Sequence, residues 1–253
     1  MLSHRVIPVL LHEDDGLVKT RGFRDATYVG DPINAIRIFN EKEVDELALI
    51  DIERSKRGLP PNLELVERVA SECFMPLSYG GGIRTVDDTK RLFSVGVEKV
   101  IVQGAALRSV DIVSEIADFS GSQSVTVAVD IRRDKFGKLH LYDSASGRDL
   151  ARDWLAFIKE VQDAGAGEIL LTSVANEGSM TGLDLELIAS AARVTTVPLV
   201  VNGGVGSVDD IVRGIAAGAD AVAVGSYFVF HGPRRGVLIS YPLYSELQRR
   251  LGG

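Results

Sequence analysis

The feature that most constrains the fold is an internal repeat. Two segments align without a gap at a spacing of 122 residues: PLSYGGGIRTVDDTKRLFSVGVEKVIV, which starts at Pro76, and PLVVNGGVGSVDDIVRGIAAGADAVAV, which starts at Pro198. The same offset places DELALID (45–51) on GEILLTS (167–173). A repeat of this kind indicates duplicated supersecondary units. The chain is therefore predicted to consist of two similar halves, about residues 1–121 and 122–253, within one domain.

Each half alternates short apolar runs with amphipathic stretches. Near-continuous apolar strands separated by helices indicate a parallel sheet covered by helices. Eight such units in about 250 residues match a closed (β/α)₈ barrel, a TIM barrel. An open, doubly wound sheet is the alternative, but a half repeat of four units favours closure. The expected strands lie near 5–11, 47–52, 77–80, 99–103, 125–130, 168–173, 198–202 and 220–224.

Composition limits the function. The net charge of −7 argues against a sequence-independent nucleic-acid binder. The single cysteine excludes an intrachain disulfide and suits a reducing compartment. No apolar run reaches 18 residues, and MLSHRVIPVL is too short for a secretory signal, so a cytoplasmic protein without membrane insertion is expected. No cofactor is implied, and the four histidines (His4, His12, His140 and His231) lack metal-ligand spacing.

The C-terminal strand ends are where a barrel of this kind carries its chemistry. In chain order they read Leu11, Asp51, Gly80-Gly81-Gly82, Gln103-Gly104, Asp130, Ser173, Asn202-Gly203-Gly204 and Gly225-Ser226. Paired glycines before a helix allow backbone N–H groups to approach an anion. Because the pairs recur once per half, two phosphate sites are predicted at the mouth. Tight turns without a ligand are the alternative.

One carboxylate at the mouth lacks its symmetric partner. Asp130 ends the fifth expected strand, where it can act as a general acid or base. Duplication of a half-barrel would place a second aspartate opposite it, at position 11. The residue there is Leu11, which cannot transfer a proton.

Four charged residues lie at or just before the N-terminal ends of strands one, two, four and six. Two cations and two anions at similar depth can pair into a ring around the barrel axis; four unrelated solvated charges are the alternative. The residues are Arg5, Glu46, Lys99 and Glu168.

These motifs resemble the cyclase subunit of imidazole-glycerol-phosphate synthase over about residues 3–230. The resemblance is carried by RVIP at 5–8, GDP at 30–32, DELALIDI at 45–52, YGGGI at 79–83, GSQSV at 121–125, VDI at 129–131, GAGEILLTS at 165–173 and NGGVGS at 202–207. It implies a lyase-type cyclase that receives ammonia from a glutaminase, a glutamine amidotransferase docked on the N-terminal face of the barrel. The ammonia would cross the barrel axis and attack a bisphosphorylated ribulosyl aminoimidazole carboxamide, a step of histidine biosynthesis.

The resemblance also assigns roles by position. It implies that Asp130 and Lys19, in a mobile loop after the first strand, are catalytic. It makes the four charges an ammonia gate. The residues predicted to bind the phosphates or the rest of the substrate are Gly81, Gly82, Gln103, Gly104, Glu177, Gly178, Gly203, Gly204, Gly225 and Ser226.

The departures from the family pattern concentrate at the mouth. Leu11 replaces a catalytic aspartate, Gln103-Gly104 replaces an Asn-Thr pair, and SVANEGSMTG (173–182) replaces an aspartate-rich stretch. The segment FVFHGPRRGVLISYP (228–242) resembles a divergent branch associated with amido- or amidino-sugar synthesis for surface polysaccharides. Two alternatives therefore stay open: a catalytically altered subunit that activates a glutaminase and passes ammonia to a sugar amidotransferase, and a phosphosugar isomerase. Residues 132–150 are expected to form a polar excursion that covers the mouth.

Overall fold

Eight parallel strands close into a barrel in a computed structural model that describes residues 4–252. Each strand pairs with the next in chain order, and β12 pairs with β1, so the predicted (β/α)₈ barrel is confirmed and the open sheet is wrong. The barrel strands are β1 (Arg5–Glu13), β4 (Leu47–Asp51), β5 (Leu77–Gly80), β6 (Lys99–Val102), β7 (Val125–Arg133), β10 (Glu168–Ser173), β11 (Leu199–Asn202) and β12 (Ala221–Val224).

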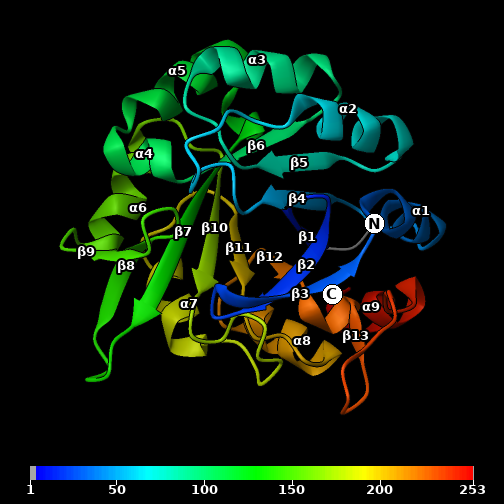
Figure 1. The fold of residues 1–253 in the computed structure, drawn as a ribbon. Helices are drawn as coiled ribbons and strands as arrows, with labels where there is room; N and C mark the ends of the chain where they lie inside the picture. The colour runs from blue at the N-terminus through cyan, green and yellow to red at the C-terminus, as the bar shows by residue number, and fades with distance from the viewer. Residues whose placement is uncertain (1–3, 253) are drawn as a thin grey trace.

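Helices surround this barrel (Figure 1). Their apolar faces pack on the outer faces of the strands to form the main core, which includes Phe39, Phe157 and Phe228. The helices are α1 (Pro32–Glu41), α2 (Leu63–Glu72), α3 (Val86–Ser94), α4 (Gly104–Arg108), α5 (Asp111–Ser120), α6 (Trp154–Asp163), α7 (Leu185–Ala192), α8 (Val208–Ala216) and α9 (Tyr244–Leu251), with 3₁₀ turns η1 (Ser122–Ser124) and η2 (Ser226–Phe228) and a small hairpin of β13 (Phe230–His231) and β14 (Gly236–Val237). Within residues 4–252, no helix combines the length and apolar character that crossing a membrane requires.

The sequence repeat is reproduced in the local structure. The bounds of β5, α3 and β6 recur 122 residues later as those of β11, α8 and β12. Thr85 caps α3 in a full capping box with Asp88. The Ser207 hydroxyl likewise accepts the backbone N–H of Asp210 at the start of α8. The Asp210 carboxylate there accepts the N–H of Gly206 and the hydroxyl of Ser207. The shared caps fix where both helices begin.

Two antiparallel hairpins extend the barrel at corresponding places in the two halves. β2 (Gly16–Arg21) and β3 (Arg24–Gly30) follow β1, and β8 (Leu139–Asp143) and β9 (Arg148–Leu150) follow β7. The polar excursion expected at 132–150 is thus the end of β7 and a hairpin, whose turn contributes Ser144 and Ala145 to the cavity at the mouth.

The barrel interior is layered along its axis because alternate residues of each strand point inward. On β1 the inward residues are Arg5, Ile7, Val9 and Leu11. Charged side chains form the bottom layer, and a separate apolar cluster that includes Leu170 fills the middle. The top layer opens into the mouth.

Candidate active site at the mouth of the barrel

Four buried or half-buried charges form a ring at the N-terminal end of the barrel. Arg5 donates to Glu46 and to Glu168 at 2.5 Å each. Lys99 Nζ lies 3.0 Å from Glu46 Oε1 and 3.6 Å from Glu168 Oε2. The hydroxyl of Ser78 donates to Glu46, and that of Thr126 donates to Glu168. Each glutamate therefore bridges both cations, so the charges do not stand apart as solvated groups.

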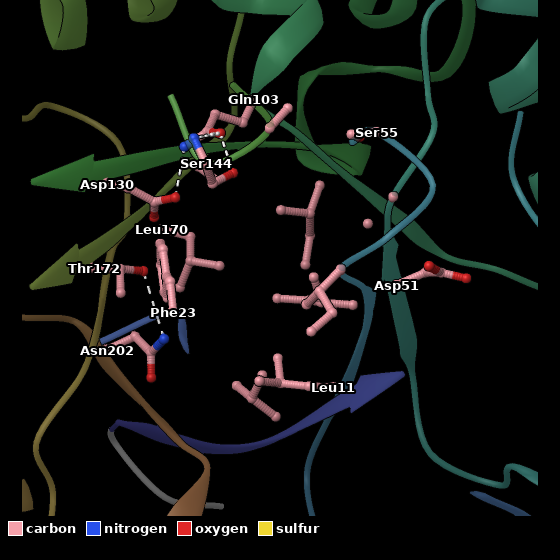
Figure 2. A pocket seen from close by; sticks show the side chains of 18 of the residues that line it. Leu11, Phe23, Asp51, Ser55, Gln103, Asp130, Ser144, Leu170, Thr172 and Asn202 are labelled. Atoms are coloured by element: carbon pink, nitrogen blue, oxygen red, sulfur yellow. Dashed lines mark hydrogen bonds between the residues drawn. The ribbon is translucent and has the colours of Figure 1, made fainter. Parts of the chain in front are cut away.

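At the opposite end, the mouth is a cavity of about 150 Å³ with unlike walls. Leu11, Ile50 and Ile101 contribute an apolar wall, whereas Asp130 and Thr172 contribute polar groups. Figure 2 shows Leu11 and Asp130 projecting into this cavity from different walls. β1 and β7 are four strands apart in the closed order, so the two residues lie on opposite sides of the barrel.

Asp130 is the best candidate for proton transfer. Its side chain is 6% exposed, and Gln103 Nε2 donates to its Oδ2 at 2.6 Å. Burial raises the pKa of Asp130 to about 7, further supported by the nearby charges of Glu177 and Asp143, while hydrogen bonds from Gln103 and Thr172 act in the opposite direction. A carboxyl that titrates near neutral pH is suited to act as both acid and base.

The raised pKa has a consequence for stability. Between pH 4 and 7 the folded protein binds the Asp130 proton more tightly than the unfolded chain does, so stability falls as the pH rises through this window. We expect Asp130→Asn to increase the free energy of unfolding at pH 8 by about 2–4 kcal/mol. The gain should disappear below about pH 4, where the carboxyl is neutral in both states.

Chemical denaturation at pH 4 and pH 8 measures this effect. Asp118→Asn, at an exposed aspartate of α5, is the matched control and should show no such pH-dependent gain. Equal stability of Asp130→Asn and the unmodified protein at pH 8 would contradict a buried, destabilising carboxylate.

Lys19 lies in a strand rather than in a mobile loop, which corrects the sequence-based expectation. Residues 16–30 form the β2–β3 hairpin, whose two-residue turn is Gly22-Phe23 with φ of 62° at both positions. Such a turn has the twist that a tight hairpin needs. The Lys19 side chain is 3% exposed and its ammonium donates to the carbonyl of Val9. Burial lowers the pKa of Lys19 to about 8, with Glu177 opposing the shift.

Glu177 fastens this hairpin to the loop after β10. Its Oε1 accepts from the hydroxyl of Thr20 at 3.0 Å, and its Oε2 accepts from the N–H of Phe23 at 3.1 Å. The N–H of Gly22 donates to the Glu177 carbonyl at 3.0 Å. Both carboxylate oxygens are thus engaged by the protein, and the assignment of Glu177 to ligand binding stays a prediction.

We expect Glu177→Ala to loosen the hairpin. Loss of two hydrogen bonds to a charged acceptor should speed amide exchange in residues 16–30 by about tenfold or more. Hydrogen exchange measured by mass spectrometry tests this. Thr20→Val, which removes only one of the two donors, should give a smaller effect in the same segment. Unchanged exchange in Glu177→Ala would show that the hairpin is held by its pairing with β1 alone.

The predicted phosphate-binding glycines form two unlike groups. Gly178, Gly203, Gly204, Gly225 and Ser226 line one small hollow beside the main cavity. Gly204 must be glycine there, because its φ is +108° and a Cβ would lie 2.1 Å from the carbonyl oxygen of Gly182. A hollow lined by backbone suits a phosphate, and phosphate binding there stays a prediction.

The other group is less open. Gly81 and Gly104 line the main cavity, but the N–H of Gly82 donates to the hydroxyl of Ser55 at 3.1 Å. A ligand phosphate at Gly82 would have to displace that hydroxyl. Gln103, predicted to bind the phosphates or the rest of the substrate, uses its side chain in protein contacts, so this site also stays a prediction.

One of the strand ends at the mouth, Asp51, caps the turn that follows it. Its Oδ1 accepts from the backbone N–H groups of Glu53 and Arg54, and its side chain points away from the cavity in Figure 2.

Two groups at the mouth, Thr172 and Ser144, were not predicted from the sequence. The inward position of β10 is Thr172, one residue before Ser173, and it contacts Asp130. Strict alternation along β10 from Glu168 would have found Thr172. Ser144 had no sequence signal.

The fold and this site define a (β/α)₈ barrel with a buried acid–base candidate at its mouth and an ion-paired ring at its other end. The family model described as "Histidine biosynthesis protein" matches residues 5–233. The chain belongs to this histidine biosynthesis protein family.

Curated relatives agree with the assignment. The chain is 47% identical to a Pseudomonas aeruginosa protein named "Putative imidazole glycerol phosphate synthase subunit hisF2", over 98% of this chain and 99% of that protein. It is 46% identical to a Leptospira borgpetersenii protein named "Putative imidazole glycerol phosphate synthase subunit HisF", over 96% of each. It is 38% identical to the Streptococcus sanguinis protein named "Imidazole glycerol phosphate synthase subunit HisF", over 90% of this chain and 92% of that protein.

Proposed function

We propose that this chain is the ammonia-using subunit of an imidazole-glycerol-phosphate-synthase-type enzyme, a lyase that works with a separate glutaminase. The observation that carries the proposal is the arrangement along one axis. The ion-paired ring of Arg5, Glu46, Lys99 and Glu168 closes one end, and the buried Asp130 stands at the other. An ammonia source docked at the ring would face the mouth through the barrel.

In this proposal the residues of the mouth divide the work. Asp130, with a pKa of about 7, exchanges protons with the ammonia nucleophile and the substrate. Lys19, with a pKa of about 8, supplies a positive charge or a proton donor close to the reacting atoms. The hollow at Gly204 and the glycines at Gly81 and Gly104 would hold the two phosphates of a bisphosphorylated imidazole-pathway substrate.

The test uses the purified chain, an ammonium salt and the bisphosphorylated ribulosyl aminoimidazole carboxamide. We expect ammonia-dependent loss of this substrate, abolished in Asp130→Ala. A glutaminase partner should support the same loss from glutamine. No substrate loss with either nitrogen source would refute the cyclase activity.

Leu11 favours a second candidate. A subunit whose mouth has lost one of two opposed carboxylates can still activate a glutaminase and release ammonia to a sugar amidotransferase of polysaccharide synthesis. That candidate predicts glutamine hydrolysis stimulated by this chain without loss of the imidazole-pathway substrate. No observation favours the phosphosugar isomerase, which has no use for the ion-paired ring.

A further inference from the structure

Gln103 makes an unusually complete set of contacts for a side chain at the rim of a cavity. Its Oε1 accepts from the N–H of Ser144 at 3.1 Å and from the Ser144 hydroxyl at 2.5 Å. Its Nε2 donates to the carbonyl of Tyr142 at 3.3 Å and to Asp130 Oδ2 at 2.6 Å. Two acceptor positions and two N–H groups are all that a glutamine amide possesses.

The backbone partners fix which way the amide points. A backbone N–H can only donate, so the Gln103 atom facing Ser144 N is the oxygen. A backbone carbonyl can only accept, so the atom facing Tyr142 is the nitrogen. The remaining N–H therefore points at Asp130, and Asp130 Oδ2 must act as an acceptor. Figure 2 shows Gln103 close to Ser144 and Asp130, with dashed lines marking the hydrogen bonds that join them.

We propose that Gln103 is a positioning residue for Asp130, which it ties to the β8–β9 turn through Ser144 and holds with Oδ2 as an acceptor. The functional meaning of this role rests on the proposed use of Asp130 in proton transfer, but the contacts do not. The role also accounts for a glutamine here, because the side chain must span from β6 to both Asp130 and a turn that starts 41 positions later in the chain.

Other charges act on the same carboxyl and must be separated from Gln103. Glu177, on the loop after β10, and Asp143, at the end of β8, both disfavour ionisation of Asp130. Lys19, on β2, lines the same cavity. On β10 the neutral Thr172 supplies a second hydrogen bond. A change at position 103 removes the contact with Asp130 together with those to Ser144 and Tyr142, and leaves the side chains of Glu177, Asp143, Lys19 and Thr172 unaltered.

The test is an NMR titration of the Asp130 carboxyl in protein labelled with ¹³Cγ-aspartate, with Asp130→Asn used to identify the signal. We expect Gln103→Met, similar in size but without hydrogen bonds, to raise the pKa of Asp130 by about one unit. Gln103→Glu keeps an acceptor for Ser144 but sets a carboxyl against Asp130, and should raise the apparent pKa at least as much. Gln123→Met, at an exposed glutamine, is the matched control and should leave the midpoint unchanged.

An unchanged Asp130 midpoint in the position-103 variants would overturn the proposal. If Gln103→Met fails to fold, Gln103→Leu takes its place, because Gln103→Glu raises the pKa of Asp130 by repulsion whether or not Gln103 positions it. The titration requires no substrate, so its result is independent of the proposed function, which ammonia-dependent turnover judges separately. A pH profile of that turnover should move upward with the NMR midpoint in Gln103→Met, a shift that mere loosening of the mouth would not produce.

Discussion

Leu11→Asp is expected to increase ammonia-dependent loss of the imidazole-pathway substrate by about 10²–10⁴-fold, the effect of one positioned acid–base group. Position 11 faces the mouth from β1, on the opposite side of the barrel from Asp130. The substitution would place a second carboxyl opposite Asp130 without changing the strand. Position 11 pairs with Ile50 and Val18 through its backbone, which the substitution leaves unchanged.

The surroundings of Leu11 also define the control. Its apolar neighbours Ile50, Val9 and Leu170 would raise the pKa of a carboxyl placed there, which suits a general acid near neutral pH. Leu11→Asn introduces a side chain of similar size and polarity to aspartate, but one that cannot transfer a proton. It should therefore give no increase in substrate loss. Absence of substrate loss in both Leu11→Asp and the unmodified chain would mean that the mouth does not bind this substrate productively, which favours ammonia delivery as its role. Equal, measurable rates would mean that Asp130 and Lys19 suffice without a second carboxyl.

Glu46→Ala is expected to lower the free energy of unfolding by about 2–4 kcal/mol at pH 7. Glu46 is 4% exposed and accepts from Arg5, Lys99 and Ser78, so its removal leaves two cations to a single glutamate, Glu168. Loss of one partner of a buried ion pair typically costs 3–5 kcal/mol. The lower figure applies here because the Arg5 and Lys99 side chains are 31% and 22% exposed and can turn towards solvent.

The pH dependence distinguishes this loss from a packing defect. Burial raises the pKa of Glu46, but the charges of Lys99 and Arg5 outweigh burial and hold it below its ordinary value of 4.5. The stabilisation is therefore present above about pH 4.5 and is lost as the pH falls through the lower, folded-state pKa. The difference in the free energy of unfolding between Glu46→Ala and the unmodified chain should therefore be full at pH 7 and should shrink as the pH falls below about 4.5, which denaturation curves at a series of pH values measure.

Glu98→Ala, at the exposed residue before Lys99, is the matched control for the ring. It should change the free energy of unfolding by less than about 0.5 kcal/mol. A Glu46→Ala variant as stable as Glu98→Ala at pH 7 would show that the ring contributes nothing to folding. If the ring gates ammonia, Glu46→Ala should also alter glutamine-dependent turnover more than ammonia-dependent turnover.

Much of the fold was predictable because it depends on local patterns. The apolar runs located all eight barrel strands, and the starts of α1 and α3 coincide with local capping residues, Asp31 before Pro32 and Thr85. The β2–β3 hairpin was not predicted, although the segment GLVKTRGFRDATYV (16–29) has two strand-like runs on either side of a two-residue turn. Its Gly22-Phe23 turn lacks the Asn-Gly or Asp-Gly signal that marks most hairpins of this length.

The sequence by itself determined the duplicated barrel, the opposed positions of Leu11 and Asp130, and the common depth of Arg5, Glu46, Lys99 and Glu168. These features follow from strand periodicity and from the half-barrel repeat, whose offset is 122 residues for Glu46 and Glu168 and nearly that, 119, for Leu11 and Asp130. Tertiary structure alone decided the hydrogen-bond partners of two side chains. Gln103 bonds to Asp130 and Ser144, and Glu177 bonds to the β2–β3 hairpin. These partners are joined across 27 to 157 positions, and only the folded loops bring them within hydrogen-bonding distance. The burial that moves the pKa of Asp130 to about 7 arises from the same packing, which no local pattern specifies.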